Sequence, residues 1–317
     1  MKHQTVVAAR YGKFEHPLVT AKGEQRARVS LSNPQTLWFN TGTVCNITCQ
    51  RCYIESSPTN DRLVYFSEAD LRDYLGQIED RGWPITEIAF TGGEPFMNPE
   101  MIAMARASLE AGFDVLILTN AMRPMMRPKM QAGLVALQAA FGDKLTLRIS
   151  VDHYDARNHD SERGAGTFAR TIEGMVWLRD IGIHMAIAGR TIWGETDAQS
   201  RAGFAALFAK HGFAIDAENP GETVLFPEMD ESVDVPEITT ACWQILGKSA
   251  DEVMCSSSRM VVKRKGADHP AVLACTLLPY SAEFEMGRTL AEAENDVLLN
   301  HPHCSKFCVL GGASCSA

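Results

Sequence analysis

The stretch Thr36-Leu-Trp-Phe-Asn-Thr41, soon followed by Cys45-Asn-Ile-Thr-Cys49-Gln-Arg-Cys52-Tyr53, sets an extended apolar run just before three closely spaced thiols. The first segment has the apolar and aromatic residues typical of a buried strand. A closed zinc site needs four ligands, and the loop holds no further Cys or His to complete one. A metal centre bound by these thiols alone would keep an open coordination position, which is typical of reactive sites.

Beyond this stretch, short apolar runs alternate with longer amphipathic ones from residue 37 to about 226, which is the pattern of repeated βα units. The expected strands are 37–41, 85–91, 114–119, 145–151, 184–191 and 223–226. The expected helices are 67–81, 99–111, 129–141, 167–181 and 199–211. These repeats predict a parallel sheet that is either closed or curved as a partial barrel.

Polar loops follow the first four expected strands. They are the cysteine loop, Thr91-Gly-Gly-Glu-Pro95, Thr119-Asn-Ala121 and Ser150-Val-Asp152. Because working groups of parallel βα folds lie where strands end, we expect these loops to converge on one rim.

Composition narrows the class of protein. The 317 residues carry a net charge of −9, so the chain lacks the basic surface that nucleic acid or anionic membrane recruits. The N-terminus does not read as a signal peptide and no apolar run reaches membrane-spanning length, so we expect a cytoplasmic protein. Nine cysteines, an odd number, favour metal ligation over a disulfide framework.

The two best motifs together resemble a known family. Cys45-x3-Cys49-x2-Cys52 and the Gly92-Gly-Glu-Pro95 sequence match the signature of radical S-adenosylmethionine (SAM) enzymes. The stretch from His159 to Phe168 resembles the SPASM/twitch branch of that family. The likeness covers residues 37–226, with a weaker cysteine pattern from 255 to 315.

This resemblance implies a partial (β/α)6 TIM-like barrel with a small C-terminal cysteine-rich appendage. We expect an N-terminal extension (1–36), a radical SAM barrel (37–230) and a SPASM/twitch-like auxiliary-cluster region (231–317). It also implies a 4Fe–4S cluster on Cys45, Cys49 and Cys52 that binds SAM. Residues expected to contact SAM are Tyr53, Gly92, Gly93, Glu94, Asn120, Ser150, Asp152, Arg163 and Leu225.

The implied roles differ in kind. Glu94 and the backbone beside it would bind the SAM amino group, Ser150 and Arg163 the ribose or carboxylate, and Leu225 the adenine. Simpler roles stay open: Arg163 as a surface arginine, Asn120 as a turn residue and Asp152 as a helix cap. Arg51 stands where the family commonly has an aromatic residue, and Arg190 is a weaker candidate.

The C-terminal cysteines resemble the ligands of an auxiliary cluster. We expect a second 4Fe–4S cluster on Cys255, Cys275, Cys304 and Cys308, with Cys315 as a possible substitute for one of them. A structural zinc site built from the same thiolates is the rival. Cys242 is expected to be a buried free thiol.

The expected activity is hydrogen abstraction by a 5′-deoxyadenosyl radical, leading to oxidation of a substrate. We favour a small molecule over a peptide, because family members that modify ribosomal peptides often carry a long leader-binding domain before the barrel. The partner would be an electron donor such as flavodoxin or ferredoxin. The alternatives are a peptide- or protein-modifying SPASM enzyme and a non-catalytic iron–sulfur or zinc sensor or scaffold. The residues do not identify a catalytic acid or base.

Overall fold

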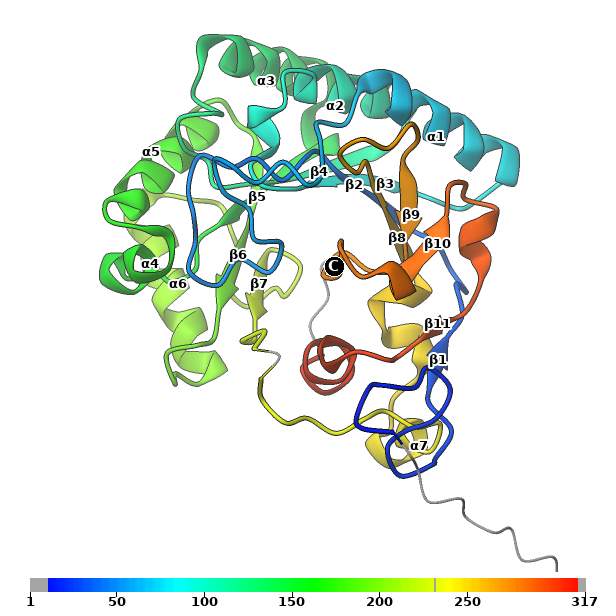
Figure 1. The fold of residues 1–317 in the computed structure, drawn as a ribbon. Coiled ribbons are helices and arrows are strands. Elements are labelled where there is room, and N and C mark those ends of the chain that lie inside the picture. Colours follow the sequence, from blue (N-terminus) through cyan, green and yellow to red (C-terminus); the bar gives the residue numbers. More distant parts are fainter. Residues whose placement is uncertain (1–10, 231, 313–317) are drawn as a thin grey trace, which may run out of the picture.

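The computed structural model describes residues 11–230 and 232–312. Its main sheet has the strand order β10-β9-β8-β2-β3-β4-β5-β6-β7 and curves around a central space, with helices on its outer side (Figure 1). The strands that follow the βα pattern are β2 (Thr36–Asn40), β3 (Glu87–Thr91), β4 (Asp114–Thr119), β5 (Leu145–Ser150), β6 (His184–Arg190) and β7 (Thr223–Phe226). The helices between them are α1 (Glu68–Arg81), α2 (Met101–Glu110), α3 (Pro128–Phe141), α4 (Ala156–Arg163), α5 (Thr167–Asp180) and α6 (Asp197–His211).

The expected partial barrel is confirmed. Strands β2 to β7 lie side by side in chain order, and each pairs in parallel with the next. Among the described residues no pairing joins the edge strands β7 and β10, so the barrel stays open on that side.

Local sequence explains the helix boundaries. The Ser67 hydroxyl accepts from the Asp70 amide at the start of α1, and Gly82 ends it in the left-handed region at φ 62°. Thr196 and Gln199 form a reciprocal capping box at the start of α6. These signals fix where each helix begins, and therefore how long each strand-to-helix loop can be.

Alternate strand residues face two different cores, as the period of a strand requires. The outer core lies between the strands and α1–α6, and includes Phe39, Phe90 and Leu147. The inner core lies on the opposite face of the sheet and includes Trp38 and Met260. The strands carry apolar residues toward both cores, as parallel sheets covered on both faces do. Polar residues interrupt them, as in the LTLRIS sequence of β5.

The C-terminal region continues the barrel sheet, which differs from the expected core-poor appendage. Strand β8 (Ser258–Val262) pairs in parallel with β2, while β9 (Ala271–Leu273) and β10 (Glu285–Gly287) follow in antiparallel order. Sequence reasoning missed this because β8 is short and its partner lies more than 200 residues earlier. The C-terminal region shares one apolar core with the inner face of the barrel strands. The domain boundary at residue 230 therefore stays a prediction.

The N-terminal segment packs on this same C-terminal region. Strand β1 (Arg28–Val29) pairs with β11 (Val297–Leu298), and the Arg26 backbone forms an isolated antiparallel β-bridge with Thr239. The buried Arg26 side chain bonds Glu237 at 2.6 Å. The backbone from Ala27 to Asn33 is therefore bonded to the C-terminal part of the chain, whereas the Gln35 carbonyl accepts from the Thr86 and Glu87 amides at the start of β3.

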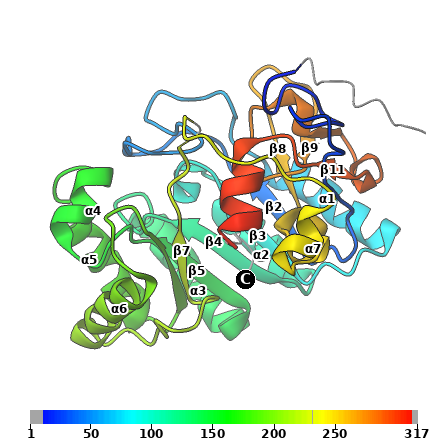
Figure 2. The same ribbon diagram turned by 90° about the horizontal axis from the view of Figure 1, so that it is seen from below.

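A π-helix, Cys304–Leu310, lies beside the open edge of the barrel, between β7 and α7 (Cys242–Leu246) in both ribbon views (Figures 1 and 2). Its Phe307 ring lies 5.3 Å from the Phe226 ring at the end of β7. The remaining short helical turns are 3-10 segments at Pro95–Met97, Gly142–Lys144, Ala250–Glu252, Met254–Ser256, Ala282–Phe284 and Glu292–Glu294. Across 11–230 and 232–312, no helix is both long enough and apolar enough to cross a bilayer.

Candidate functional site

The cysteine loop begins as an extension of β2 that stays bonded to the end of β3. The Gly93 amide donates to the Gly42 carbonyl at 2.8 Å, and the Glu94 amide to the Val44 carbonyl at 3.2 Å. A Cβ at Gly93 would lie 2.3 Å from the Val44 oxygen, and one at Gly92 2.5 Å from the Gly42 oxygen. Both glycines are therefore required for this close approach, which brings Cys45 next to the Gly92-Gly-Glu-Pro95 loop.

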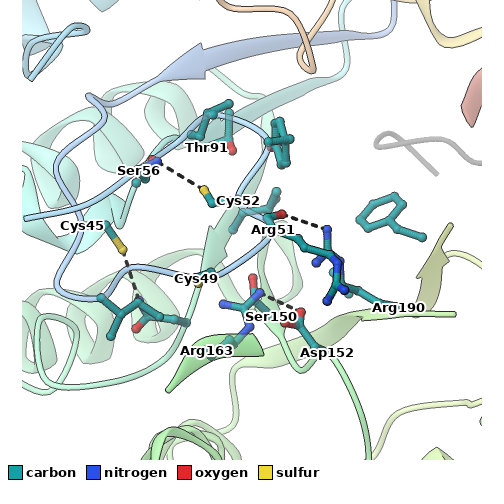
Figure 3. Close-up of a pocket in the computed structure, with 18 of the residues that line it drawn as sticks. Cys45, Cys49, Arg51, Cys52, Ser56, Thr91, Ser150, Asp152, Arg163 and Arg190 are labelled. Carbon is teal, nitrogen blue, oxygen red and sulfur yellow. Dashed lines mark hydrogen bonds and ion pairs between the residues drawn. The ribbon is translucent and has the colours of Figure 1, made fainter. Parts of the chain in front are cut away.

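The three loop thiols line one cavity at the carboxyl ends of the strands. Figure 3 shows Cys45, Cys49 and Cys52 on one side of it, facing Ser150, Asp152 and Arg163 on the other. The expected residues that line this cavity are Cys45, Cys49, Cys52, Tyr53, Gly92, Gly93, Asn120, Ser150, Asp152 and Arg163. The structure thus brings together residues from four separate loops.

Two of the loop thiols, Cys45 and Cys49, are in a setting that disfavours a free thiolate. Burial raises the pKa of the Cys45 thiol to about 12. Burial also raises the pKa of Cys49, against an opposing effect of the Arg163 charge. A coordinated metal reverses this preference, because a bound cation deprotonates its thiol ligands.

Glu94 is held beside the cavity but is not part of its lining. Its Oε1 accepts from the Thr119 hydroxyl at 2.8 Å and the Phe96 amide at 3.2 Å, and its Oε2 from the Asn120 amide at 2.9 Å. Burial raises the pKa of this carboxyl to about 6, and the three hydrogen bonds oppose the rise. The carboxylate thus joins the end of β4 to the loop after β3.

Asp152 and Arg163 form a buried ion pair in the cavity wall. Arg163 Nη2 donates to Asp152 Oδ1 at 2.9 Å, and both side chains are largely shielded from water. The nearby Arg163 charge holds the pKa of the Asp152 carboxyl below its usual range, against the effect of burial. Arg163 is therefore not a surface arginine, and the Asp152 carboxylate pairs with it in the cavity wall.

Helix α4, which presents Arg163, was missed by sequence reasoning. Its residues are polar throughout and show no apolar period, so the pattern gave no helix signal. The one available signal was Asp155, whose side chain accepts from the amides of Arg157 and Asn158 at the start of the helix.

Leu225, which we expected to lie against the adenine, does not line the cavity. Its side chain packs in the outer core, close to Gly189 and Phe204. Phe226, one residue later, lines the cavity together with Met229. Side chains alternate along a strand, so neighbouring residues such as Leu225 and Phe226 point to opposite faces of the sheet. The sequence of β7 is too short to show which of the two faces the cavity.

The Arg51 side chain lies in a group of ion pairs. Its side chain pairs directly with Glu162 of α4 and, at 3.1 Å, with Glu228 beyond β7. Tyr53 lies in the lining of the cavity and at its outer mouth. The position of the Arg51 side chain is set by the carboxylates of Glu162 and Glu228. Both lie more than 100 residues later in the sequence, so no local pattern indicates the contact.

A second cavity lies between β9 and the π-helix. Cys255, Cys275, Cys304 and Cys308 line it, and the remaining lining is apolar, including Leu277, Phe284 and Leu299. Burial raises the pKa of Cys255 to about 11 and that of Cys304 well above its ordinary value. The expected auxiliary ligands therefore face one dry space, while Cys315 lies outside the described residues.

The remaining cysteine is separate from both cavities. Cys242 Sγ accepts from the Thr239 amide at 3.3 Å in the turn before α7. Within 11–230 and 232–312, no three His, Cys, Asp or Glu side chains are arranged to hold a single metal ion. A cubane cluster is larger than one ion and is bound by thiolates at different corners.

Comparisons with known proteins agree with this geometry. A model of the radical SAM superfamily matches residues 39–199, about half of the chain. The antilisterial bacteriocin subtilosin biosynthesis protein AlbA of Bacillus subtilis (strain 168) is 32% identical over 145 residues, 45% of this chain and 30% of that protein. An AdoMet-dependent heme synthase of Methanosarcina barkeri (strain Fusaro / DSM 804) is 27% identical over 156 residues, 48% of this chain and 41% of that protein. The chain thus matches less than half the length of these curated relatives.

Two solved structures share the fold over most of the chain. Streptococcus suis SuiB bound to precursor peptide SuiA gives a TM-score of 0.60 at 13% identity, covering 84% of this chain and 66% of that one. Native anSMEcpe with bound AdoMet gives 0.57 at 14% identity, covering 87% and 83%. At such identities the likeness is one of fold.

Proposed function

Because this chain belongs to the radical SAM superfamily, we propose that Cys45, Cys49 and Cys52 hold a 4Fe–4S cluster with SAM bound at its open corner. When bound, the cluster supplies the low-potential electron that splits SAM into methionine and a 5′-deoxyadenosyl radical. The observation that carries this proposal is the convergence of these thiols and the candidate SAM contacts on one cavity.

The residues of the chain would bind and orient SAM. The tight turn at Gly92 and Gly93 lets backbone approach the methionine amino group, for which the Glu94 carboxylate supplies a negative charge. Arg163, fixed by Asp152, presents a cation for the methionine carboxylate or the ribose. Tyr53, Phe226 and Met229 offer apolar surface for adenine and keep water away from the reacting groups.

We assign the second cavity to an auxiliary 4Fe–4S cluster on Cys255, Cys275, Cys304 and Cys308. Its dry, apolar lining suits a thiolate-bound cluster, and such a group would supply an acceptor for one electron. The proposed reaction is therefore an oxidation: the substrate gives a hydrogen atom to the radical, forming 5′-deoxyadenosine, and then loses one proton and one further electron.

For the substrate we now place a peptide ahead of a small molecule. AlbA is named for bacteriocin biosynthesis and SuiB binds a precursor peptide, which favours a peptide and weighs against the sequence-based preference. A small molecule remains the second candidate because of the similarity to an AdoMet-dependent heme synthase. The proposed electron donor is a flavodoxin or ferredoxin.

The first test is cleavage of SAM by the anaerobically reconstituted, reduced protein. We predict that the unmodified chain releases 5′-deoxyadenosine and that Cys49→Ala abolishes this while its circular dichroism is unchanged. Cys242→Ala is the matched control, since that thiol lines neither cavity. Iron binding without 5′-deoxyadenosine would favour a sensor, and zinc in place of iron would contradict the proposal.

A second prediction separates the two cavities. Cys275→Ala should still release 5′-deoxyadenosine but form no oxidised product, because it removes a ligand only from the second site. Transfer of deuterium from a labelled peptide or small molecule into 5′-deoxyadenosine identifies the substrate class. Full product formation by Cys275→Ala would remove the oxidative role of the second site.

A further inference from the structure

The dipeptide Gln50-Arg51, between the second and third cysteines of the loop, is bonded to two elements of the barrel rim through its backbone. The Gln50 amide donates to the Glu162 carbonyl of α4 at 2.9 Å. The Arg51 carbonyl accepts from Arg190 Nη2, at the end of β6, at 3.0 Å (Figure 3). The short segment that separates Cys49 from Cys52 is therefore fixed at both of its residues.

The side chains repeat the same connections. Arg51 Nη1 bonds Glu162 Oε1 directly, and Arg190 Nη1 lies 3.5 Å from Glu162 Oε2. Arg51 Nε lies 3.1 Å from Glu228 Oε1, just beyond β7. Glu162 thus pairs with two arginines, one from the cysteine loop and one from the sheet.

Stability alone does not explain this arrangement. The side chains of Glu162 and Arg190 are only 4% and 9% exposed. Removing charges from water is costly, and a buried ion pair is often no more stabilising than a well-packed apolar pair of the same volume. These ion pairs do favour one fixed arrangement of the loop and α4, because each pair requires its two partners at defined positions.

The same helix also carries the wall of the SAM cavity. Arg163, which follows Glu162 directly, bonds Asp152 in that wall. Adjacent residues of α4 therefore hold the cysteine loop on one side and the cavity lining on the other. A shift of α4 would move both together.

We infer that Glu162, Arg51 and Arg190 are positioning residues that clamp the Gln50-Arg51 backbone and so set where Cys49 and Cys52 present their thiols. The inference rests on the proposed assignment of these thiols to a cluster. It gives the arginine that replaces the common aromatic residue a role in holding the loop. None of the three residues is assigned a chemical step.

The test uses the full-length, anaerobically reconstituted protein with Arg51→Gln and Glu162→Gln. Iron release to a ferrous chelator is followed over time, together with the change that SAM causes in the electron paramagnetic resonance signal of the reduced protein. We expect release from the loop site to become about 10- to 100-fold faster, on the scale of the loss of metal affinity that follows when the partners of metal ligands are removed. Release from the second site should be unchanged and serves as an internal reference.

Two further variants separate positioning from general destabilisation. Glu237→Gln breaks another buried pair, with Arg26, far along the chain from the loop, and should leave iron release and the SAM response unchanged. Arg51→Lys keeps the charge but loses the planar fork that reaches both Glu162 and Glu228, so it should restore iron retention only in part.

The outcomes are distinct. If Arg51→Gln retains iron and responds to SAM like the unmodified protein, the clamp is refuted; this variant decides even if Glu162→Gln fails to fold, because Arg51 is 46% exposed. If Glu237→Gln accelerates release equally, the effect is general and the clamp is also refuted. An unmodified protein that binds no cluster would overturn both this inference and the proposed function. If the unmodified protein cleaves SAM but Arg51→Gln does not release iron faster, only the inference about the clamp is overturned.

Discussion

At the scale of single residues, burial sets the charge state of the polar groups around the site. His159 of α4 is fully buried, and neither ring nitrogen has a hydrogen-bond partner among residues 11–230 and 232–312. Burial, followed by the nearby Arg163 charge, lowers the pKa of this imidazole to about 4. The neutral ring instead packs edge-on against Phe168, 5.4 Å away.

This gives a pH dependence with a definite sign. Between about pH 6.5 and pH 4 the unfolded chain binds a proton at His159 and the native chain does not, so stability falls as the pH falls through this window. The loss amounts to roughly 3 kcal/mol at about 1.4 kcal/mol per pH unit. We predict that His159→Leu removes this component, which chemical denaturation at pH 7, 5.5 and 4.5 would reveal. Parallel stability curves for the two proteins would contradict it.

Residues also show where sequence reasoning stops. Strand ends of a parallel sheet meet at one rim, which predicted that the loop thiols, the two glycines, Asn120, Ser150 and Asp152 lie together. Arg163 was expected there only from the family resemblance, and it also lines the cavity. Phe226 was missed in favour of Leu225 because the face of a short strand depends on its pairing register. The partners of Arg51 are distant in sequence, so only the folded chain brings them together.

At the scale of elements, the two loops at the ends of β2 and β3 behave as one unit. Their backbones bond each other, and Gly93 leaves no room for a side chain between them. The strands and outer helices could be predicted from their periodicity, since each buries one regular face. Helix α4 and β8 could not, because one has no apolar face and the other finds its partner across the chain.

The glycine contact can be tested against a matched position. Gly93→Ala should lower the free energy of unfolding by about 1–3 kcal/mol, the usual cost of overpacking, and reduce iron retention. Gly76→Ala in α1, where a Cβ meets nothing within 4 Å, should instead raise stability by about 0.5–1 kcal/mol. Thermal melts and iron analysis of both variants check this, and equal behaviour would contradict the assigned role of the loop contact.

At the scale of the whole molecule, the C-terminal region continues the barrel sheet beyond β2 and contributes most of the lining of the second cavity. Its strand β8 covers β2, and its apolar residues surround Trp38 on the inner face. The likeness of fold to SuiB and anSMEcpe covers most of the chain. The family resemblance of the C-terminal cysteines implied that Cys255, Cys275, Cys304 and Cys308 belong together, and all four line the second cavity. It did not indicate that their region shares the barrel core.

This sharing predicts the result of a truncation. A chain ending at residue 230 loses β8 and exposes the edge of β2 and the buried Trp38. We expect it to be insoluble or to bind a hydrophobic dye strongly, because an uncovered apolar strand edge promotes aggregation. A soluble, cooperatively folded 1–230 fragment would show instead that the barrel is an independent folding unit.

The central claim is that the loop thiols hold a cluster whose open corner binds SAM. The most direct measurement is the electron paramagnetic resonance spectrum of the reduced, anaerobic protein with and without SAM. The account predicts that SAM changes the cluster signal in the unmodified protein and in Cys275→Ala, and that the change is absent in Cys49→Ala. A signal that SAM leaves unaltered in the unmodified protein would contradict it.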